Sequence, residues 1–203
     1  MPIYDPIYEF GSLQVSGQEG VADLRPYFPG KTYVGADMRA GPGVDLILNL
    51  HNIKLASETV GTVLLLETLE HVEYPHKAME EIYRIMKPTS LLIMSSVLNF
   101  PIHAYPDDYW RFTPSCFSSL LKSFDSSYVQ YFGKKSFPHT VIGIASRGKP
   151  LEIEKNTSLI KGIDKLKDRY YFATGDTLKS YLNQCYPPIL SKLYSIMYPE
   201  RTK

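Results

Sequence analysis

The sequence has few cysteines, no excess of basic charge and no long apolar run, and each shortage removes a class of protein. Cys116 and Cys185 are the only thiols in 203 residues, so neither a disulfide framework nor a thiolate metal site is predicted. Basic residues number 22 against 21 acidic ones, a net charge of +1 that argues against a nucleic-acid surface. No apolar stretch has membrane-spanning length and no charged-then-apolar leader follows Met1. We expect a cytoplasmic protein with no membrane span and no nucleic-acid partner.

Hydrophobic and aromatic residues are plentiful. They include 16 tyrosines and 9 phenylalanines, and apolar types make up 44% of the chain. A core of ordinary size is therefore available, and part of the aromatic set must line surfaces or a pocket. The length suits one domain with an elaboration.

Short apolar segments alternate with amphipathic ones as far as Gly148. The segments predicted as strands are Ile7–Phe10, Thr32–Asp37, Val44–Asn49, Thr62–Glu67, Ser90–Val97, Val129–Phe132 and Val141–Ser146. Those predicted as helices are Gln18–Tyr27, Pro75–Met86 and Thr113–Phe124. The early strands are almost continuously apolar, which is typical of strands buried on both faces of a parallel sheet. The pattern predicts an α/β fold, a doubly wound, mostly parallel, Rossmann-like sheet of seven strands.

The composition changes after Gly148. We expect residues 1–148 to form the main domain and residues 149–203 to form a helical C-terminal extension that packs on it. Almost nothing precedes the first strand, so the Tyr-rich extension and the segment YPDDYWRF (residues 105–112) are expected to roof the ligand site.

Polar residues end four of the predicted strands: Glu9, Asp37, Asn49 and Glu67. In a doubly wound sheet, ligands bind beyond these carboxyl ends. Asp37 suits the two hydroxyls of a ribose, and a turn at Gly11 lets a ligand approach the backbone. The alternative is that these acids only cap neighbouring turns. The loop has two glycines, Gly11 and Gly17, where a pyrophosphate site would have three at close spacing, so a nucleoside with a zwitterionic tail fits better: S-adenosylmethionine.

Four stretches in order resemble the class I S-adenosylmethionine-dependent methyltransferases, in particular their small type-11-like group. The stretches are YEFGSLQVSG (8–17), YVGADMRAGPGVDLILNLHNI (33–53), LLLETLEHVEYPHKAMEEIYRIMKP (64–88) and DDYWRFTP (107–114). The resemblance covers about residues 7–148. It implies methyl transfer to an oxygen or nitrogen nucleophile of a small-molecule acceptor, by a monomer or homodimer. The alternative is a catalytically silent binding or scaffold protein with the same fold.

The resemblance also implies cofactor contacts at single positions. Glu9 matches the acid near the methionine tail, Asp37 the ribose acid, and Met38 the residue beside the adenine. Glu67 opens the segment beneath the transferred methyl group. The full set of matching positions is Glu9, Gly11, Ser12, Leu13, Asp37, Met38, Asn49, Leu50, His51, Glu67, Thr68 and Leu69.

The candidate residues for binding and activating the acceptor are ionisable, aromatic or charged. His71 and Asp108 are the candidate catalytic bases, with His103 and Asp107 as further candidates. The candidate acceptor-binding residues lie after the fifth strand and are Tyr105, Tyr109, Trp110 and Arg111. The alternative is that Arg111 pairs with Asp107 or Asp108 and only builds the loop.

The segment ETLEH has a second interpretation. The spacing of Glu67, Glu70 and His71 resembles the metal site of small-RNA 2′-O-methyltransferases and of some quinone methyltransferases, where a divalent ion could hold an acceptor hydroxyl. The alternative is that Glu70 and His71 simply start the following helix. We favour the helix start and predict no metal.

Overall fold

The computed structural model describes residues 2–15, 19–20, 22–103, 106–153 and 161–162. Most of the proposed extension, residues 149–203, lies outside the described residues, as does Tyr105. The division into a main domain and a helical cap, and the role of that cap as a roof, therefore stay predictions.

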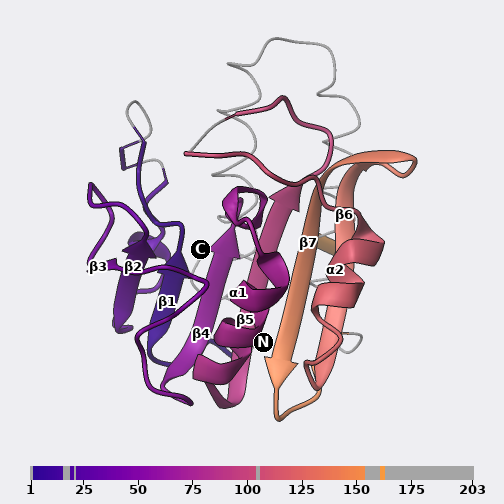
Figure 1. Cartoon of the computed structure of the whole chain (residues 1–203). Helices are drawn as coiled ribbons and strands as arrows, with labels where there is room; N and C mark the ends of the chain where they lie inside the picture. The colour runs from indigo at the N-terminus through magenta and orange to yellow at the C-terminus, as the bar shows by residue number, and fades with distance from the viewer. Residues whose placement is uncertain (1, 16–18, 21, 104–105, 154–160, 163–203) are drawn as a thin grey trace.

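One seven-stranded sheet, in the order β3-β2-β1-β4-β5-β7-β6, organises the chain (Figure 1). The strands are β1 (Ile7–Phe10), β2 (Tyr33–Asp37), β3 (Leu46–Ile47), β4 (Val60–Leu66), β5 (Met86–Val97), β6 (Ser126–Lys134) and β7 (Phe137–Arg147). Strands β1 to β5 pair in parallel, whereas β7 is antiparallel to both β5 and β6. The predicted doubly wound, mostly parallel sheet is confirmed.

The strand order reverses direction between β1 and β4. From β1 the chain steps outward to β2 and β3, and then returns to place β4 on the other side of β1. The connections that leave β1 and β4 therefore diverge, which opens a crevice beyond their carboxyl ends. This topology fixes where a ligand site can lie.

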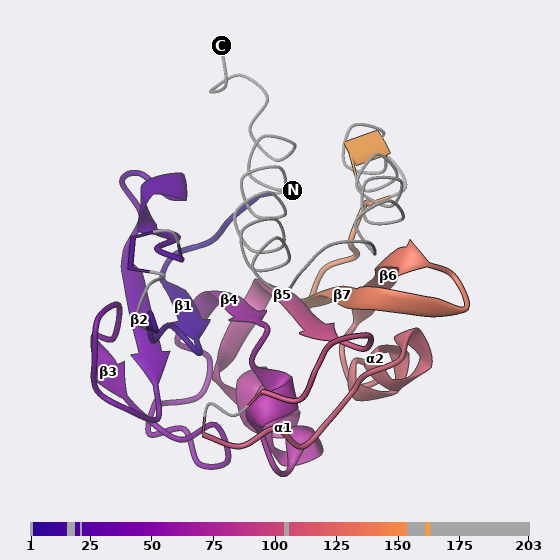
Figure 2. The same cartoon turned by 90° about the horizontal axis from the view of Figure 1, so that it is seen from above.

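The helices of the described residues differ from the predictions in two places. Helix α1 (Pro75–Ile85) agrees, while α2 (Pro114–Leu120) stops short of Phe124 because Asp125 N–H already bonds to Ser146 O and draws the chain into β6. Figures 1 and 2 show both helices on one face of the sheet.

The helix predicted over residues 18–27 is wrong in the residues that the structure describes. Only a 3-10 turn, η1 (Arg25–Tyr27), forms there. Gly20 has a φ of +75°, which an α-helix does not allow, and Pro26 lacks the backbone donor that a continuing helix needs. A second 3-10 turn, η2 (Leu69–His71), follows β4.

Two apolar clusters hold the sheet, one on each face. Along β4, Val63 and Leu65 belong to the cluster that includes α1 and α2, whereas Leu64 and Leu66 belong to the opposite cluster. Every residue of β4 is buried, as its continuous apolar run predicts. The central strands therefore hold their carboxyl ends rigidly at one edge. None of the helices in the described part of the chain is long and apolar enough to cross a membrane.

Candidate active site

A cavity of about 520 Å³ lies at the carboxyl ends of the parallel strands. Ligand pockets in proteins have volumes of roughly 300–1,000 Å³, so this cavity has room for a small molecule. Its walls include these predicted cofactor residues: Glu9, Gly11, Ser12, Leu13, Asp37, Met38, Asn49, Leu50, His51, Glu67 and Thr68. Leu69 is the exception, because its side chain is fully buried in the core and does not line the cavity.

The turn after β1 requires glycine. Gly11 has a φ of +82°, and a Cβ there would lie 2.2 Å from Thr68 Oγ1. Thr68 in turn hydrogen bonds across the crevice, with its Oγ1 2.8 Å from Leu66 O and 3.1 Å from Phe10 O. The tips of β1 and β4 are thus joined through the Thr68 hydroxyl group. Ser12, next in the chain, is buried against the cavity and its Oγ has no hydrogen-bond partner.

Glu9 and Asp37 are both carboxylic acids at strand ends, but their surroundings differ. Glu9 is only 4% exposed and accepts a hydrogen bond of 2.8 Å from the Tyr33 hydroxyl. Burial raises the pKa of Glu9 to about 7. Asp37 accepts a hydrogen bond of 2.9 Å from the Arg39 backbone N–H, and its side chain faces the cavity. Beside it, Met38 lines the cavity and is 55% exposed, so it presents a large apolar side chain there.

Asn49 and His51 are held in place by the main chain. Asn49 Oδ1 accepts a hydrogen bond of 2.8 Å from His51 N–H, and His51 Nε2 accepts one of 3.1 Å from Tyr74 N–H. The segment predicted to contact adenine is therefore fixed before any ligand binds.

Two buried carboxyl groups lie at the end of β4. Glu67 has a φ of +45°, an unusual conformation for a residue with a side chain. Its Oε1 accepts a hydrogen bond of 2.7 Å from Ser95 Oγ, and Glu70 Oε2 accepts one of 2.7 Å from Ser96 Oγ. The second oxygen of each carboxyl group is buried without a hydrogen-bond partner. Burial raises the pKa of Glu67 to about 7. Burial, together with the charge of Glu67, also raises the pKa of Glu70 well above its ordinary value.

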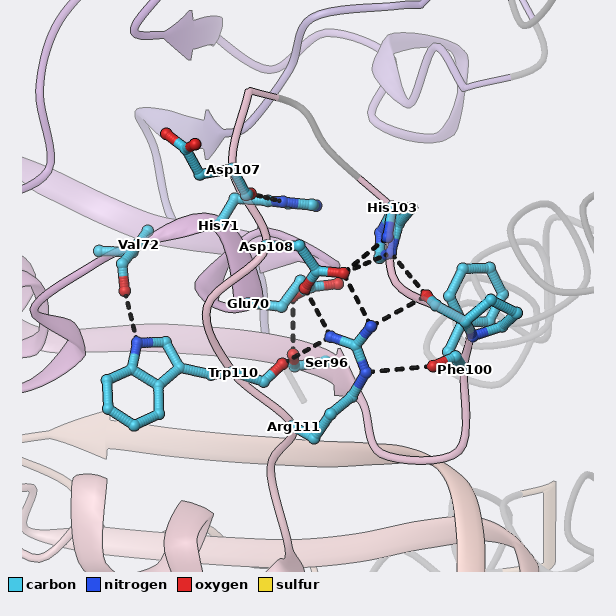
Figure 3. A network of polar contacts seen from close by, with 11 residues as sticks. Glu70, His71, Val72, Ser96, Phe100, His103, Asp107, Asp108, Trp110 and Arg111 are labelled. Carbon is cyan, nitrogen blue, oxygen red and sulfur yellow. Dashed lines mark hydrogen bonds and ion pairs between the residues drawn. The ribbon is translucent and has the colours of Figure 1, made fainter.

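Two histidines lie beside Glu70 (Figure 3). His71 Nδ1 lies 2.6 Å from Asp107 O, and His103 Nδ1 lies 3.1 Å from Asp108 Oδ2. The two imidazole rings meet edge to face, with their centroids 4.8 Å apart. Burial lowers the pKa of His71, which favours the neutral ring. His71, His103, Glu67 and Glu70 all line the cavity.

Arg111 and Trp110 hold the loop together in this structure. Arg111 binds Asp108 through two hydrogen bonds, of 2.5 Å and 2.7 Å, and also donates to the carbonyl groups of Phe100 and Pro101. The hydrogen bonds from Arg111 lower the pKa of Asp108 to about 2. Trp110 Nε1 donates to Val72 O at 3.0 Å.

These contacts give the loop residues a structural task. Asp108, Trp110 and Arg111 do not line the cavity, whereas Tyr109 does and is 45% exposed. An acid with so low a pKa is a poor proton acceptor at neutral pH, so the geometry does not favour Asp108 as a base. A contact between the acceptor and Tyr109, Trp110 or Arg111 stays a prediction.

Sequence reasoning missed one wall of the cavity. Ser95, Val97, Phe100, His139 and Thr140 line it as well. Burial lowers the pKa of His139 to about 4. Because β7 runs antiparallel to β5, with Val97 opposite Thr140, the start of β7 lies beside the end of β5. Only the strand order brings these residues to the site, and no local motif signals it.

Residues 31–94 match the family model described as a methyltransferase domain. The matched segment contains β2 to β4 and η2, and therefore Asp37, Glu67 and His71. A comparison with curated protein sequences finds no match.

Solved structures with the same fold include several described as methyltransferases. An S-adenosylmethionine-dependent methyltransferase from Archaeoglobus fulgidus is 12% identical, with a TM-score of 0.55 over 70% of this chain and 85% of that one. A possible histamine N-methyltransferase from Thermotoga maritima is 16% identical, with a TM-score of 0.52 over 70% and 81%. The 1,6-didemethyltoxoflavin-N1-methyltransferase of Burkholderia thailandensis, solved with its substrate and S-adenosylhomocysteine, is 14% identical, with a TM-score of 0.53 over 70% and 71%. At these identities the likeness is one of fold.

Proposed function

Since this chain has the fold of the class I S-adenosylmethionine-dependent methyltransferases and carries a segment that matches the methyltransferase domain family, we propose that it methylates an oxygen or nitrogen nucleophile of a small-molecule acceptor. One observation carries the proposal. A single cavity at the point where the strand order reverses contains the Gly11 turn, the Asp37 carboxylate and the groups that follow β4.

The residues present fit S-adenosylmethionine. Asp37 offers a carboxylate for the ribose hydroxyls, and Met38 offers an exposed apolar surface for a flat base. Ser12 Oγ and Glu9 provide a buried hydroxyl and a carboxyl group where the polar tail would lie. When bound, S-adenosylmethionine supplies a methyl group on a positively charged sulfur, which is already activated for transfer.

The chain's own contribution is to hold an acceptor, exclude water and take up the acceptor's proton. The end of the cavity beyond β4 has the groups for this task. Tyr109 forms an exposed aromatic wall, and Glu67, Glu70 and His71 lie beside it with ionisable groups. These groups can act as a general acid or base only if the acceptor enters the cavity at the end beyond β4.

Calorimetric titration with S-adenosylmethionine and S-adenosylhomocysteine tests the proposed cofactor site. Replacement Asp37→Ala removes the acceptor for two ribose hydroxyls, a loss of roughly 2–3 kcal/mol, so the affinity should fall about 100-fold. The control is Asp125→Ala, an exposed aspartate outside the cavity, which should bind like the wild type. Equal dissociation constants for the wild type and the Asp37→Ala protein would reject this placement of the ribose.

The alternative proposal is a catalytically silent binding module. The ion pair between Asp108 and Arg111 favours this alternative, because Asp108, one of the two predicted catalytic bases, is bound to Arg111 and is a poor proton acceptor. A methyl-labelled cofactor incubated with small-molecule extracts separates the two functions. An enzyme transfers the label and releases S-adenosylhomocysteine, whereas a silent module binds the cofactor and leaves it intact.

A further inference from the structure

We propose that Glu70, His71 and His103 form a binding site for a divalent transition-metal cation at the acceptor end of the cavity. One possible ligand atom from each of the three residues lies within 4.8 Å of the others. All three residues line the cavity, and Figure 3 shows their side chains turned toward the same space. From the sequence we expect no metal, because Glu70 and His71 are interpreted as the start of the following helix. The structure places them in η2 instead and brings His103, which is remote in the chain, beside them.

Glu70 is the strongest reason for a cation. Its side chain is fully buried, Ser96 Oγ satisfies one carboxyl oxygen, and the other has no hydrogen-bond partner. A buried carboxylate oxygen that has lost its water needs a compensating positive charge or a proton. Glu67 has a second buried oxygen, and its carboxyl group lies close enough to hydrogen bond to that of Glu70 when one of the two is protonated. The two carboxyl groups therefore lie close together in a region that excludes water.

The two imidazoles are oriented as metal ligands commonly are. His71 Nδ1 faces Asp107 O, and His103 Nδ1 faces both Asp108 Oδ2 and Pro101 O. An Nδ1–H that donates to an oxygen leaves Nε2 as the nitrogen with the lone pair in a neutral ring. Oxygen acceptors behind a histidine are the usual support for a metal-bound imidazole.

The surrounding charges are compatible with a cation. Arg111 is the nearest positive side chain in the polar network, and Asp108 binds it through both carboxyl oxygens. The charge of Arg111 also acts on Glu70 and His71, but both of its carboxylate hydrogen bonds go to Asp108. Around one ion with bonds of about 2.1 Å, ligand atoms lie at most about 4.2 Å apart, so small side-chain rotations would close the present spacing.

The ligand set selects the metal and the acceptor. Two imidazole nitrogens and one carboxylate suit Zn²⁺, Mn²⁺, Fe²⁺ or Co²⁺ better than Ca²⁺ or Mg²⁺. Three protein ligands leave positions open for an acceptor oxygen, and a bound cation lowers the pKa of a hydroxyl group. Resting on the proposed function, this assigns the acceptor to the hydroxyl-bearing small molecules.

Metal binding is measured directly on the full chain without an affinity tag. Mn²⁺ titrated into the metal-stripped protein, followed by electron paramagnetic resonance, and Zn²⁺ titrated in a calorimeter should each show one site. Replacement Glu70→Gln should weaken both affinities more than about tenfold, because a ligand and its charge are lost. His103→Ala should do the same. Because the His103 side chain is partly exposed, this variant keeps the test available if the Glu70→Gln protein does not fold. The matched controls are His76→Ala and Glu80→Gln, exposed residues of α1, which should bind metal like the wild type.

Two results would overturn the site. One is a wild-type protein that takes up neither cation, which would mean that a proton alone neutralises the acidic pair. The other is metal binding that survives Glu70→Gln and His103→Ala together. Cofactor titration of the same metal-free proteins keeps this test apart from the proposed function. A protein that binds S-adenosylmethionine but no metal rejects only the cation, and one that binds metal but no cofactor rejects only the methyltransferase.

Discussion

Burial changes the chemistry of single acidic residues in this molecule. Glu9 and Asp37 end neighbouring strands, and burial raises the pKa of Glu9 to about 7. In the unfolded chain Glu9 ionises near its ordinary value of 4.5. Between pH 4.5 and about pH 7, Glu9 is therefore protonated in the folded state and ionised in the unfolded state. The stability contributed by this group is full at low pH and is lost as the pH rises toward 7.

Replacement Glu9→Gln should remove that pH dependence. Between pH 5 and pH 8 the free energy of unfolding of the wild type should fall by about 2–3 kcal/mol more than that of the Glu9→Gln protein. The amide can still accept the Tyr33 hydrogen bond, so the folded structure should be kept. Urea unfolding of both proteins at several pH values measures the difference. A constant gap between the two curves would mean that Glu9 ionises normally in the folded protein.

At the scale of elements, the turn after β1 is tightly constrained. Gly11 combines a φ of +82° with a Cβ position that would overlap Thr68, whereas Gly30 has a φ of +74° and open space around its Cβ position. The two glycines therefore separate backbone strain from steric overlap.

Replacement Gly30→Ala should cost about 1 kcal/mol of unfolding free energy, since only the backbone conformation resists it. Gly11→Ala should cost more than about 3 kcal/mol, because the new methyl group also displaces Thr68 and the contact between β1 and β4. Adding Thr68→Ala should recover part of the loss in the Gly11→Ala protein. Equal losses at the two glycines would show that the turn relaxes freely.

The sequence predicts elements where one local signal dominates. The seven strands follow from their apolar runs, and α1 follows from its helical period and Pro75 at its start. Residues 18–27 mislead because the polar and apolar spacing is helical while Gly20 and Pro26 oppose a helix. Local composition alone does not show which influence dominates.

The candidate site is predictable on one side only. The strand ends bring Glu9, Asp37 and Glu67 together because parallel strands align their carboxyl ends. The other side depends on contacts between distant segments. Which aspartate binds Arg111, and hence where His103 lies, is decided by packing of the loop against η2.

At the scale of the whole molecule, the sheet order determines the function that the chain can support. Burial on both faces fixes β1 and β4, and the reversal of strand order leaves the cavity beyond their ends. The antiparallel β7 then completes its wall with His139 and Thr140. The site is thus a property of the fold, while its chemistry belongs to a few polar side chains.

The most direct test of this account is a crystal structure of the chain grown with S-adenosylhomocysteine. The account predicts the ribose hydroxyls on the Asp37 carboxylate, the adenine against Met38, and the amino-acid tail between the Gly11 turn and Glu9. It also predicts that the sulfur points toward Glu67 and Glu70, where the acceptor would enter. A ligand bound elsewhere, or the same cavity filled only by water at saturating ligand, would contradict the central claim that this cavity holds the methyl donor.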